Sequence, residues 1–478
     1  MHKSKVRLGY CPSHRANPLE LFSRDEAVRY KEMIQNELAA ADVEIITIDD
    51  VCPDGLLSAY EDVPAVIEKF RAVGIDAMMI ALCSFGEEGP TCEVARSLHV
   101  PVLLYGPRDG APRADGRRMR DSQCGLFALG KVLRRFQVPF TYLTNEDPQT
   151  GYFRKGIDRF IRVAQTVKAM RNLRILQYGT RPTSFVSVAC NEGELMERFG
   201  IEVIPIAISD LADSCRAILK KNEPRLTSAA EALMRDFTIE NTDKHGTALR
   251  LAALKLAIMD DRAKYRASCA ALQCWSAIQG LLGIYPCAVN GLLADEGFPV
   301  ACETDIHGAI SAVLLQAAMG YTQPQFFADI TVRHPEDDNA ELLWHCGPFP
   351  PSLAKPGCER CITNHWTQSD GLPGDLAYPL RDGELTVCRF DGLGGEYSLL
   401  TGEGHTTNGP HTVGTYVWMK VNDWPLWEHK LVKGPYIHHI AGVYGQCAEV
   451  LTEACRYIPG LTPDPCEPGL PELEKRWR

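Results

Sequence analysis

Short apolar segments alternate with helical segments at the start of the chain, and this alternation constrains the fold more than any other feature of the sequence. In order, the apolar segments are residues 6–12, 43–48, 77–82 and 100–105, and the helical segments are residues 24–40, 63–72 and 91–98. Strands that alternate with helices form parallel sheets covered by helices. The sequence therefore predicts a doubly wound α/β domain over residues 1–171, with ligand sites at the carboxyl ends of its strands.

The alternation begins again after Asn172 and later gives way to a different pattern. In order, the sequence predicts a strand at 173–179, a helix at 191–199, a strand at 201–206, helices at 226–237 and 246–270, and strands separated by turn residues at 385–390, 396–401, 415–421 and 431–440. Strands that follow one another through turns are typical of antiparallel sheet. The predicted fold is two doubly wound parallel-sheet α/β domains followed by a β-rich antiparallel C-terminal domain, over residues 1–171, 172–345 and 346–478.

Composition and charge exclude several classes of protein. The net charge of −11 argues against nucleic acid as a partner, because proteins that bind it have a basic surface. The chain lacks a run of 18 apolar residues, so no membrane span is expected. The N-terminus lacks the apolar core of a signal peptide. The 18 cysteines are therefore expected to be reduced thiols in a cytoplasmic protein.

Two carboxylates in the last part of the sequence lie beside short apolar runs. Glu303 follows the run at 298–302, and Asp329 follows the run at 326–328. Such runs are predicted to be buried strands, and a carboxylate at the end of one is costly unless it is paired, hydrogen-bonded or bound to a metal. Pairing with arginine is the commoner outcome for a single buried carboxylate, but one divalent metal would explain both residues.

Histidines further along the chain are candidates to complete such a metal site. His345 lies in the run W-H-C-G, and His438 and His439 are adjacent. Because side chains alternate along a strand, only one of His438 and His439 is expected to face a given site. Oxygen ligands with one imidazole suit Mn²⁺ or Mg²⁺ better than Zn²⁺, which favours nitrogen and sulfur.

The cysteines suggest a thiolate zinc site as an alternative. Cys358 and Cys361 form one C-x-x-C pair, with His345, Cys346 and His365 nearby in the sequence. A zinc ribbon needs a second such pair or a matching histidine pair, so this pair alone is weak support for zinc. A nucleophilic triad is also weakly supported, because the sequence has no G-x-S-x-G motif.

Several motifs resemble those of the L-fucose isomerase/L-arabinose isomerase superfamily, particularly its fucose-isomerase-like members. They are C-E-T-D-I-H-G-A from Cys302, F-F-A-D-I-T from Phe326, W-H-C-G-P-F from Trp344, Y-G-P-R-D from Tyr105, and the late pair His438-His439. The resemblance implies two α/β domains followed by a β-rich domain, and a monosaccharide substrate. It also implies Mn²⁺, or another divalent cation such as Mg²⁺ or Co²⁺, and a homo-oligomer that is a trimer or a hexamer.

The resemblance further implies roles for individual residues. In the fucose-type pattern Glu303, Asp329 and His439 would hold the metal, and the two carboxylates would also transfer protons. His345 lies about where the arabinose-type pattern has a histidine ligand, and His438 stays an alternative to His439. The candidate substrate-binding residues or alternative ligands are His438, His345, Arg15, Asn290, Trp275 and Arg108.

The function that these expectations favour is a metal-dependent aldose–ketose isomerase that acts on a monosaccharide through an enediolate intermediate. The sugar would be similar to fucose or arabinose, or substituted at C6. A sulfonate at C6 would need positive charge, which the arginines at 15, 108, 113, 117 and 181 offer. The alternatives are a metal-dependent sugar aldolase or epimerase that uses the same intermediate, and a non-catalytic sugar-binding protein on the same scaffold.

Overall fold

The computed structural model describes residues 5–16, 22–171, 173–366 and 370–478. They form two compact units. Of the described residues, 5–16, 22–168, 453–457 and 471–478 form the N-terminal unit, and 169–171, 173–366, 370–452 and 458–470 form the C-terminal unit. In the described ranges, no helix is both long and apolar enough to cross a membrane.

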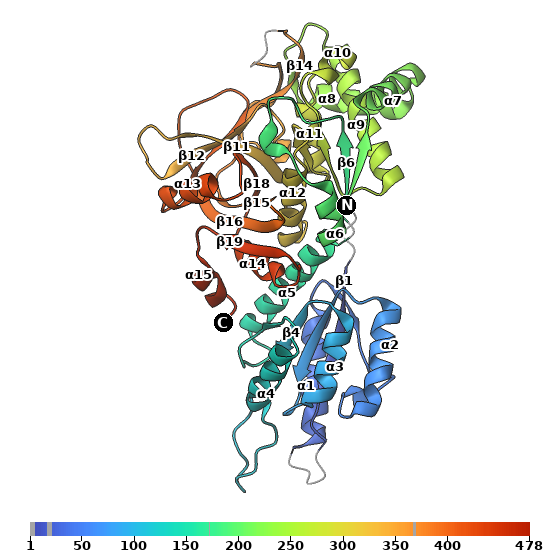
Figure 1. Ribbon diagram of the computed structural model, residues 1–478, viewed down its shortest axis with the longest axis vertical. Helices are drawn as coiled ribbons and strands as arrows, with labels where there is room; N and C mark the ends of the chain where they lie inside the picture. Colours follow the sequence, from blue (N-terminus) through green and yellow to red (C-terminus); the bar gives the residue numbers. More distant parts are fainter. Residues whose placement is uncertain (1–4, 17–21, 172, 367–369) are drawn as a thin grey trace. The chain divides into compact units, whose positions relative to one another are not determined.

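A five-stranded parallel sheet, in the order β2-β1-β3-β4-β5, forms the centre of the N-terminal unit (Figure 1). Its strands are β1 (Val6–Ser13), β2 (Val43–Ile46), β3 (Ala77–Leu82), β4 (Val102–Tyr105) and β5 (Thr141–Tyr142). The helices are α1 (Arg24–Ala39), α2 (Val63–Val73), α3 (Glu88–Leu98), α4 (Ser122–Arg135) and α5 (Gly151–Met170). Every residue of β3 is buried, which explains its continuous apolar sequence. The doubly wound parallel sheet predicted here is confirmed.

A second parallel sheet, of four strands in the order β10-β9-β6-β7, begins the C-terminal unit. Its strands are β6 (Arg174–Tyr178), β7 (Glu202–Ile206), β9 (Cys269–Leu272) and β10 (Val300–Cys302). The helices around it are α6 (Glu192–Phe199), α7 (Ile208–Lys221), α8 (Pro224–Asp236), α9 (Lys244–Tyr265), α10 (Ala277–Leu282), α11 (Cys287–Asp295) and α12 (Ile306–Ala318). The second doubly wound parallel sheet is therefore confirmed as well.

The predicted helix over residues 246–270 is wrong at its end. Helix α9 stops at Tyr265, Arg266 takes a left-handed backbone conformation (φ 53°), and β9 follows. The sequence of β9, Cys-Ala-Ala-Leu, has no strong preference for a strand. Pairing with β6 on one side and β10 on the other makes it one, so the tertiary structure overrides the local propensity.

A closed barrel forms the rest of the C-terminal unit. In ring order its strands are β11 (Gln325–Arg333), β12 (Ala340–His345), β17 (Thr415–Lys420), β16 (Glu396–Thr407), β15 (Glu384–Leu393) and β18 (His439–Tyr444). The ring closes because β16 pairs antiparallel with both β15 and β17. The same sheet is extended by β8 (Thr238–Ile239), β13 (Cys361–Asn364), β14 (Pro373–Pro379) and β19 (Leu461–Pro465). The β-rich antiparallel part of the predicted fold is thus confirmed.

Helix α12 lies against the barrel strands β15 and β18 (Figure 1). All of its residues are buried, and its sequence is apolar around nearly its whole circumference, as expected for a helix in the core. The remaining helices are α13 (Trp424–Lys433), α14 (Ala448–Cys455) and α15 (Leu470–Lys475). Because α12 directly follows β10, it links the parallel sheet to the barrel.

The predicted strand over residues 431–440 also needs correction. Residues up to Lys433 belong to α13, whose N-terminus is capped by the Asp423 side chain, which accepts from the backbone N–H of Leu426 at 3.2 Å. Strand β18 begins only at His439. His438 therefore precedes the strand, and the alternation of side chains that separates two neighbours within a strand does not apply to this pair.

Candidate active site

The loop between β10 and α12 carries Glu303 in a constrained conformation. Glu303 and Thr304 both have positive φ angles, 60° and 59°, which cost non-glycine residues about 1–3 kcal/mol each and persist where the surroundings enforce them. Asp305 then caps α12 by accepting from the backbone N–H of Gly308 at 2.9 Å. The tight turn places the buried Glu303 side chain directly after the carboxyl end of β10.

The barrel register places Asp329 beside His439. Asp329 of β11 lies directly opposite His439, the first residue of β18, and opposite Trp344 of β12. Residues opposite each other in an antiparallel pair hold their side chains close together. A shift of either strand by one residue would turn the side chain to the other face of the sheet, so the hydrogen-bonded ladder itself fixes this pair.

Three donor atoms from these two places meet around the His439 imidazole. His439 Nε2 lies 2.8 Å from Glu303 Oε2 and 3.4 Å from Asp329 Oδ1. All three atoms are buried, and none has a well-aligned hydrogen bond to any residue that the structure describes. Buried polar atoms without well-aligned hydrogen bonds are costly, so the convergence of these three favours a shared cation as their partner.

A divalent cation fits these three atoms. Adjacent ligand atoms at about 2.0–2.1 Å from an octahedral cation lie about 3 Å apart, and the distances of 2.8 and 3.4 Å from His439 Nε2 lie on either side of that spacing. Two carboxylate oxygens with one imidazole nitrogen favour a hard cation of the Mn²⁺ or Mg²⁺ kind.

Asp305 fixes the orientation of the His439 ring. Its Oδ2 lies 2.9 Å from His439 Nδ1, so that nitrogen donates to the carboxylate and Nε2 points towards Glu303 and Asp329. A carboxylate behind a histidine is the usual means by which proteins orient a metal ligand. Burial lowers the pKa of His439, but the contacts with Asp305 and Glu303 outweigh burial and raise it to about 9.

Arg389 holds the other side of Asp305 in a fully buried network. Its guanidinium donates to both oxygens of Asp305 through Nη1 and Nη2, and its Nε donates to Asp391 Oδ2 at 2.8 Å. Asp391 Oδ1 lies 2.8 Å from His307 Nδ1. Burial raises the pKa of the Asp305 carboxyl, but the charge of Arg389 and the bond to His439 outweigh it and hold that pKa far below its usual range.

Removal of Arg389 should therefore destabilise the protein. We expect Arg389→Met to lower the free energy of unfolding by about 3–5 kcal/mol, because it leaves the buried carboxylates of Asp305 and Asp391 without their counter-charge. Urea unfolding followed by circular dichroism measures this loss. The control is Arg225→Met, which removes an exposed bidentate pair with Asp260 and should shift the midpoint little. Equal stability of the two variants would contradict the predicted effect.

The other two candidate histidines lie close to this cluster. His438 Nε2 is 3.9 Å from Asp329 Oδ1, and its side chain is 45% exposed, whereas that of His439 is fully buried. Donor atoms of Asp329, His438 and His439 all lie within 4.8 Å of one another. The ring of His345 lies 6.4 Å from that of His439. The geometry therefore places His439 at the centre of the cluster and His438 at its exposed side.

The remaining predicted residues are divided between the two units. Asn290 is buried on α11, where its side-chain amide lies 3.5 Å from Cys302 Sγ, directly before the Glu303 turn. Trp275 follows β9 in the same unit. Arg15 and Arg108 belong to the N-terminal unit, and their role towards a sugar stays a prediction.

Sequence reasoning missed the residues behind the cluster, Asp305, Arg389 and Asp391. The signal for Asp305 was available, because an aspartate three residues before the glycine of an apolar run is a typical helix cap. Arg389 lies in a strand whose neighbours are buried, and nothing in its local sequence shows that it meets a carboxylate 84 positions away.

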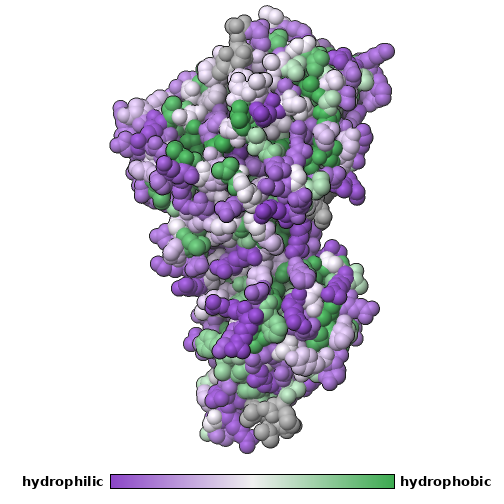
Figure 2. Space-filling model, in the orientation of Figure 1, coloured by the Kyte–Doolittle hydropathy of each residue, from purple (hydrophilic) through white to green (hydrophobic). Residues whose placement is uncertain are grey.

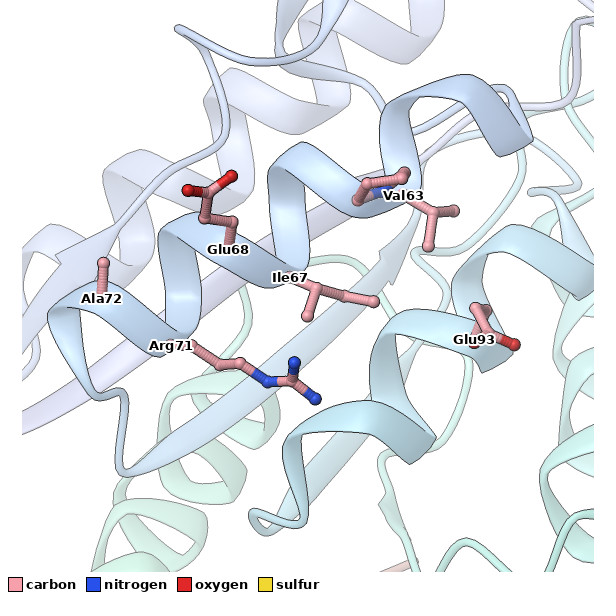
Figure 3. A pocket seen from close by; sticks show the side chains of 7 residues that line it. Val63, Ile67, Glu68, Arg71, Ala72 and Glu93 are labelled. Atoms are coloured by element: carbon pink, nitrogen blue, oxygen red, sulfur yellow. The ribbon is translucent and has the colours of Figure 1, made fainter.

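The N-terminal unit has a surface hollow that differs in character from this cluster (Figure 3). It measures about 680 Å³ and lies between α2 and α3, with Ile67 and Arg71 extending from α2 towards the helix that carries Glu93. Arg71 already donates to the Ser97 carbonyl at 2.8 Å. Elsewhere Figure 2 shows a largely hydrophilic face with apolar residues scattered over it, which is ordinary for a folded protein.

Comparison with known proteins agrees with the family resemblance of the sequence motifs. Residues 17–171 match the family model described as fucose/sulfoquinovose isomerase, N-terminal domain. A sulfoquinovose isomerase from Priestia aryabhattai is 25% identical over 411 residues, which is 85% of this chain and 90% of the relative. A sulfoquinovose isomerase from Alkalicoccus urumqiensis is 26% identical over 358 residues, which is 75% of this chain and 78% of the relative.

Solved structures give only a distant match. A periplasmic solute-binding protein from Actinobacillus succinogenes, solved with bound D-allose, is 10% identical, covers 66% of this chain and 92% of its own, and has a TM-score of 0.17. The family model and the relatives, by contrast, together span both units of the chain. The N-terminal part of the chain therefore matches the fucose/sulfoquinovose isomerase family, and the relatives, which extend that similarity over most of the chain, support an isomerase enzyme.

Proposed function

We propose that this isomerase converts a C6-sulfonated aldose of the sulfoquinovose kind to its ketose, with a divalent cation held by Glu303, Asp329 and His439. The observation that supports the cation is that three buried donor atoms converge without a well-aligned hydrogen bond to any described residue. The sulfonated substrate is supported by the relatives named sulfoquinovose isomerase, one of which aligns with 85% of the chain.

The reaction moves one carbon-bound proton and one hydroxyl proton. A base removes the proton from C2 of the open-chain aldose, which gives an enediolate, and an acid delivers a proton to C1, while the O2 proton passes to O1. Glu303 and Asp329 are the proposed base and acid, because both carboxylates lie beside His439 Nε2, where the cation would hold the sugar. They reach this position from different elements, Glu303 from the loop after β10 and Asp329 from β11. A cation bound there would act as a Lewis acid and stabilise the negative charge that develops on the sugar oxygens.

Buried surroundings increase the effect of these charges. Glu303 is 4% exposed and His439 is fully buried, so water competes little with the interactions of the reacting groups. Asp305 and Arg389 hold the His439 ring in place from behind before substrate binds. Groups held in advance in this way do not have to reorganise during the reaction.

A sulfonate at C6 needs a cationic partner, and Arg181 is the proposed one in the C-terminal unit. The adjacent strands β6, β9 and β10 are parallel, with Tyr178 opposite Leu272 and Leu272 opposite Cys302. The segments that follow them, which carry Arg181, Trp275 and Glu303, therefore leave the sheet at the same edge, where parallel sheets bind their ligands. The Phe185 ring lies 5.7 Å from the Trp275 ring, so the first two segments are in contact.

The test compares sulfonated and neutral sugars with and without metal. The protein is stripped with EDTA, dialysed, and assayed with sulfoquinovose, glucose, fucose or arabinose, with Mn²⁺ added or omitted. We expect ketose formation only with added cation, and a much higher kcat/KM for sulfoquinovose than for glucose, which shares its carbon skeleton but lacks the sulfonate. In D₂O the ketose should carry deuterium at C1, as measured by NMR.

The outcomes separate this proposal from its alternatives. Turnover that persists in the stripped protein would exclude a requirement for the cation. Equal kcat/KM for sulfoquinovose and glucose would exclude recognition of the sulfonate. A C2 epimer or carbon–carbon cleavage products in the NMR spectrum would identify an epimerase or an aldolase instead. Saturable sugar binding without any product would identify a binding protein.

A further inference from the structure

A second group of metal-ligating side chains lies in the C-terminal unit, apart from the carboxylate cluster. It consists of Cys287, Cys346, His365 and Asp375, all of them buried. One donor atom from each residue lies within 4.8 Å of the donor atoms of the other three. Cys287 begins α11, Cys346 directly follows β12, His365 directly follows β13, and Asp375 lies in β14, so the group joins four separate elements.

The distances within the group suit a tetrahedral metal ion. Cys287 Sγ and Cys346 Sγ are 3.5 Å apart, and His365 Nε2 lies 3.7 Å from Asp375 Oδ2. At zinc–sulfur bonds of about 2.3 Å, two tetrahedral sulfur ligands lie about 3.8 Å apart, and nitrogen and oxygen ligands lie about 3.4 Å apart. A disulfide requires about 2.05 Å between the sulfurs, so the present spacing is that of two co-ligands and not of a bonded pair.

Asp375 gives the strongest indication that this group can bind a cation. Its side chain is fully buried, and neither carboxylate oxygen has a well-aligned hydrogen bond to any residue that the structure describes. The polar groups near it include Cys287 and His365 of the group itself. Burial of an ionised carboxylate is costly unless a nearby cation compensates its charge. A metal ion would supply the compensating charge.

We propose that Cys287, Cys346, His365 and Asp375 bind a zinc ion as a closed structural site, separate from the catalytic cation. Two sulfur ligands select zinc over Mn²⁺ or Mg²⁺, which prefer oxygen. Four protein ligands leave no open coordination position, which is typical of structural and not of catalytic zinc. The C-x-x-C pair at Cys358 and Cys361 is not part of this group.

The proposed zinc would fix the strand that carries part of the active site. Cys346 is the neighbour of His345, whose Nδ1 lies 3.2 Å from Cys346 Sγ, and β12 supplies the residue opposite Asp329. On the other side of the group the Tyr285 ring lies 4.0 Å from the His365 ring and supports its orientation. Binding of zinc would therefore tie α11, β13 and β14 to the end of β12.

Metal analysis of the purified full-length protein tests the proposal. Protein expressed in zinc-supplemented medium and dialysed against Mn²⁺ should retain about one zinc ion per chain. Cys287→Ser and Cys346→Ser should each reduce the zinc content to near zero, whereas Cys361→Ser, the control from the C-x-x-C pair, should leave it unchanged. Asp375→Asn preserves shape and both thiols, and should weaken zinc retention against a chelator.

Cobalt substitution gives a readout that the catalytic cation cannot produce. Co²⁺ bound by thiolates has an intense sulfur-to-cobalt charge-transfer band in the near ultraviolet, and Glu303, Asp329 and His439 offer no sulfur. We expect that band in the wild type and in Cys361→Ser, and its loss in Cys287→Ser. Absence of zinc and of the band from the wild type would overturn the proposal even if the cysteine variants fail to fold. A Cys287–Cys346 disulfide in the mass spectrum, or zinc retained by both serine variants, would overturn it too.

Discussion

Glu303→Gln is expected to lower kcat by about 10²–10⁴-fold at saturating Mn²⁺, which is the range for loss of a general acid–base group. Glutamine fills the same space as Glu303, which is 4% exposed, so the fold should be preserved. Its amide cannot accept the proton from C2, and it is a poorer ligand for a hard cation than a carboxylate. Initial rates of ketose formation, measured over a Mn²⁺ titration, separate the loss of chemistry from the loss of metal.

A buried glutamate outside the cluster provides the matched control. Glu341 on β12 is also 4% exposed, and its Oε1 lies 3.5 Å from the Arg333 guanidinium. Burial raises its pKa to about 7, so its neutralisation in Glu341→Gln removes little charge at neutral pH. Glu341→Gln should keep the wild-type kcat. If Glu303→Gln also keeps it at saturating Mn²⁺, Glu303 is not the base.

Features that leave a local pattern in the sequence could be predicted from it. Apolar segments such as residues 77–82, bounded by turns, predict buried parallel strands because both faces of such strands are covered by helices. The acidic motifs around Glu303 and Asp329 predict a shared site because each carboxylate ends or interrupts an apolar run, and the metal at that site stays a prediction. The structure brings both carboxylates to His439, although 110 positions separate Asp329 from it.

Features that depend on contacts across the fold could not be predicted in the same way. The strand β9 has no sequence signal of its own, because its neighbours β6 and β10 determine its conformation. Arg389 looks like one polar residue in an apolar strand, and its partner Asp305 is 84 positions away. The cysteine, histidine and aspartate group around Cys346 draws one residue from each of four elements, so its members have no characteristic spacing.

His439→Gln is expected to weaken Mn²⁺ binding by more than about 100-fold, the upper figure for residues that only orient a metal ligand. The variant removes the imidazole nitrogen that lies 2.8 Å from Glu303 Oε2 and 3.4 Å from Asp329 Oδ1. Titration followed by the electron paramagnetic resonance signal of free Mn²⁺ gives the affinity directly. His438→Gln is the matched control, because His438 is adjacent but its side chain is 45% exposed, and it should change the affinity little.

The pH dependence of the affinity identifies the nitrogen that binds the cation. In the metal-free protein the contacts of His439 with Asp305 and Glu303 outweigh burial and raise its pKa to about 9, so at neutral pH a proton occupies the nitrogen that the cation needs. The proton must leave when the cation binds, and the wild-type affinity should therefore rise by up to about tenfold per pH unit below that pKa and level off above it. The slope should persist in His438→Gln and disappear in His439→Gln. A slope lost in His438→Gln instead would make His438 the ligand, because only the titrating imidazole that competes with the cation can produce it.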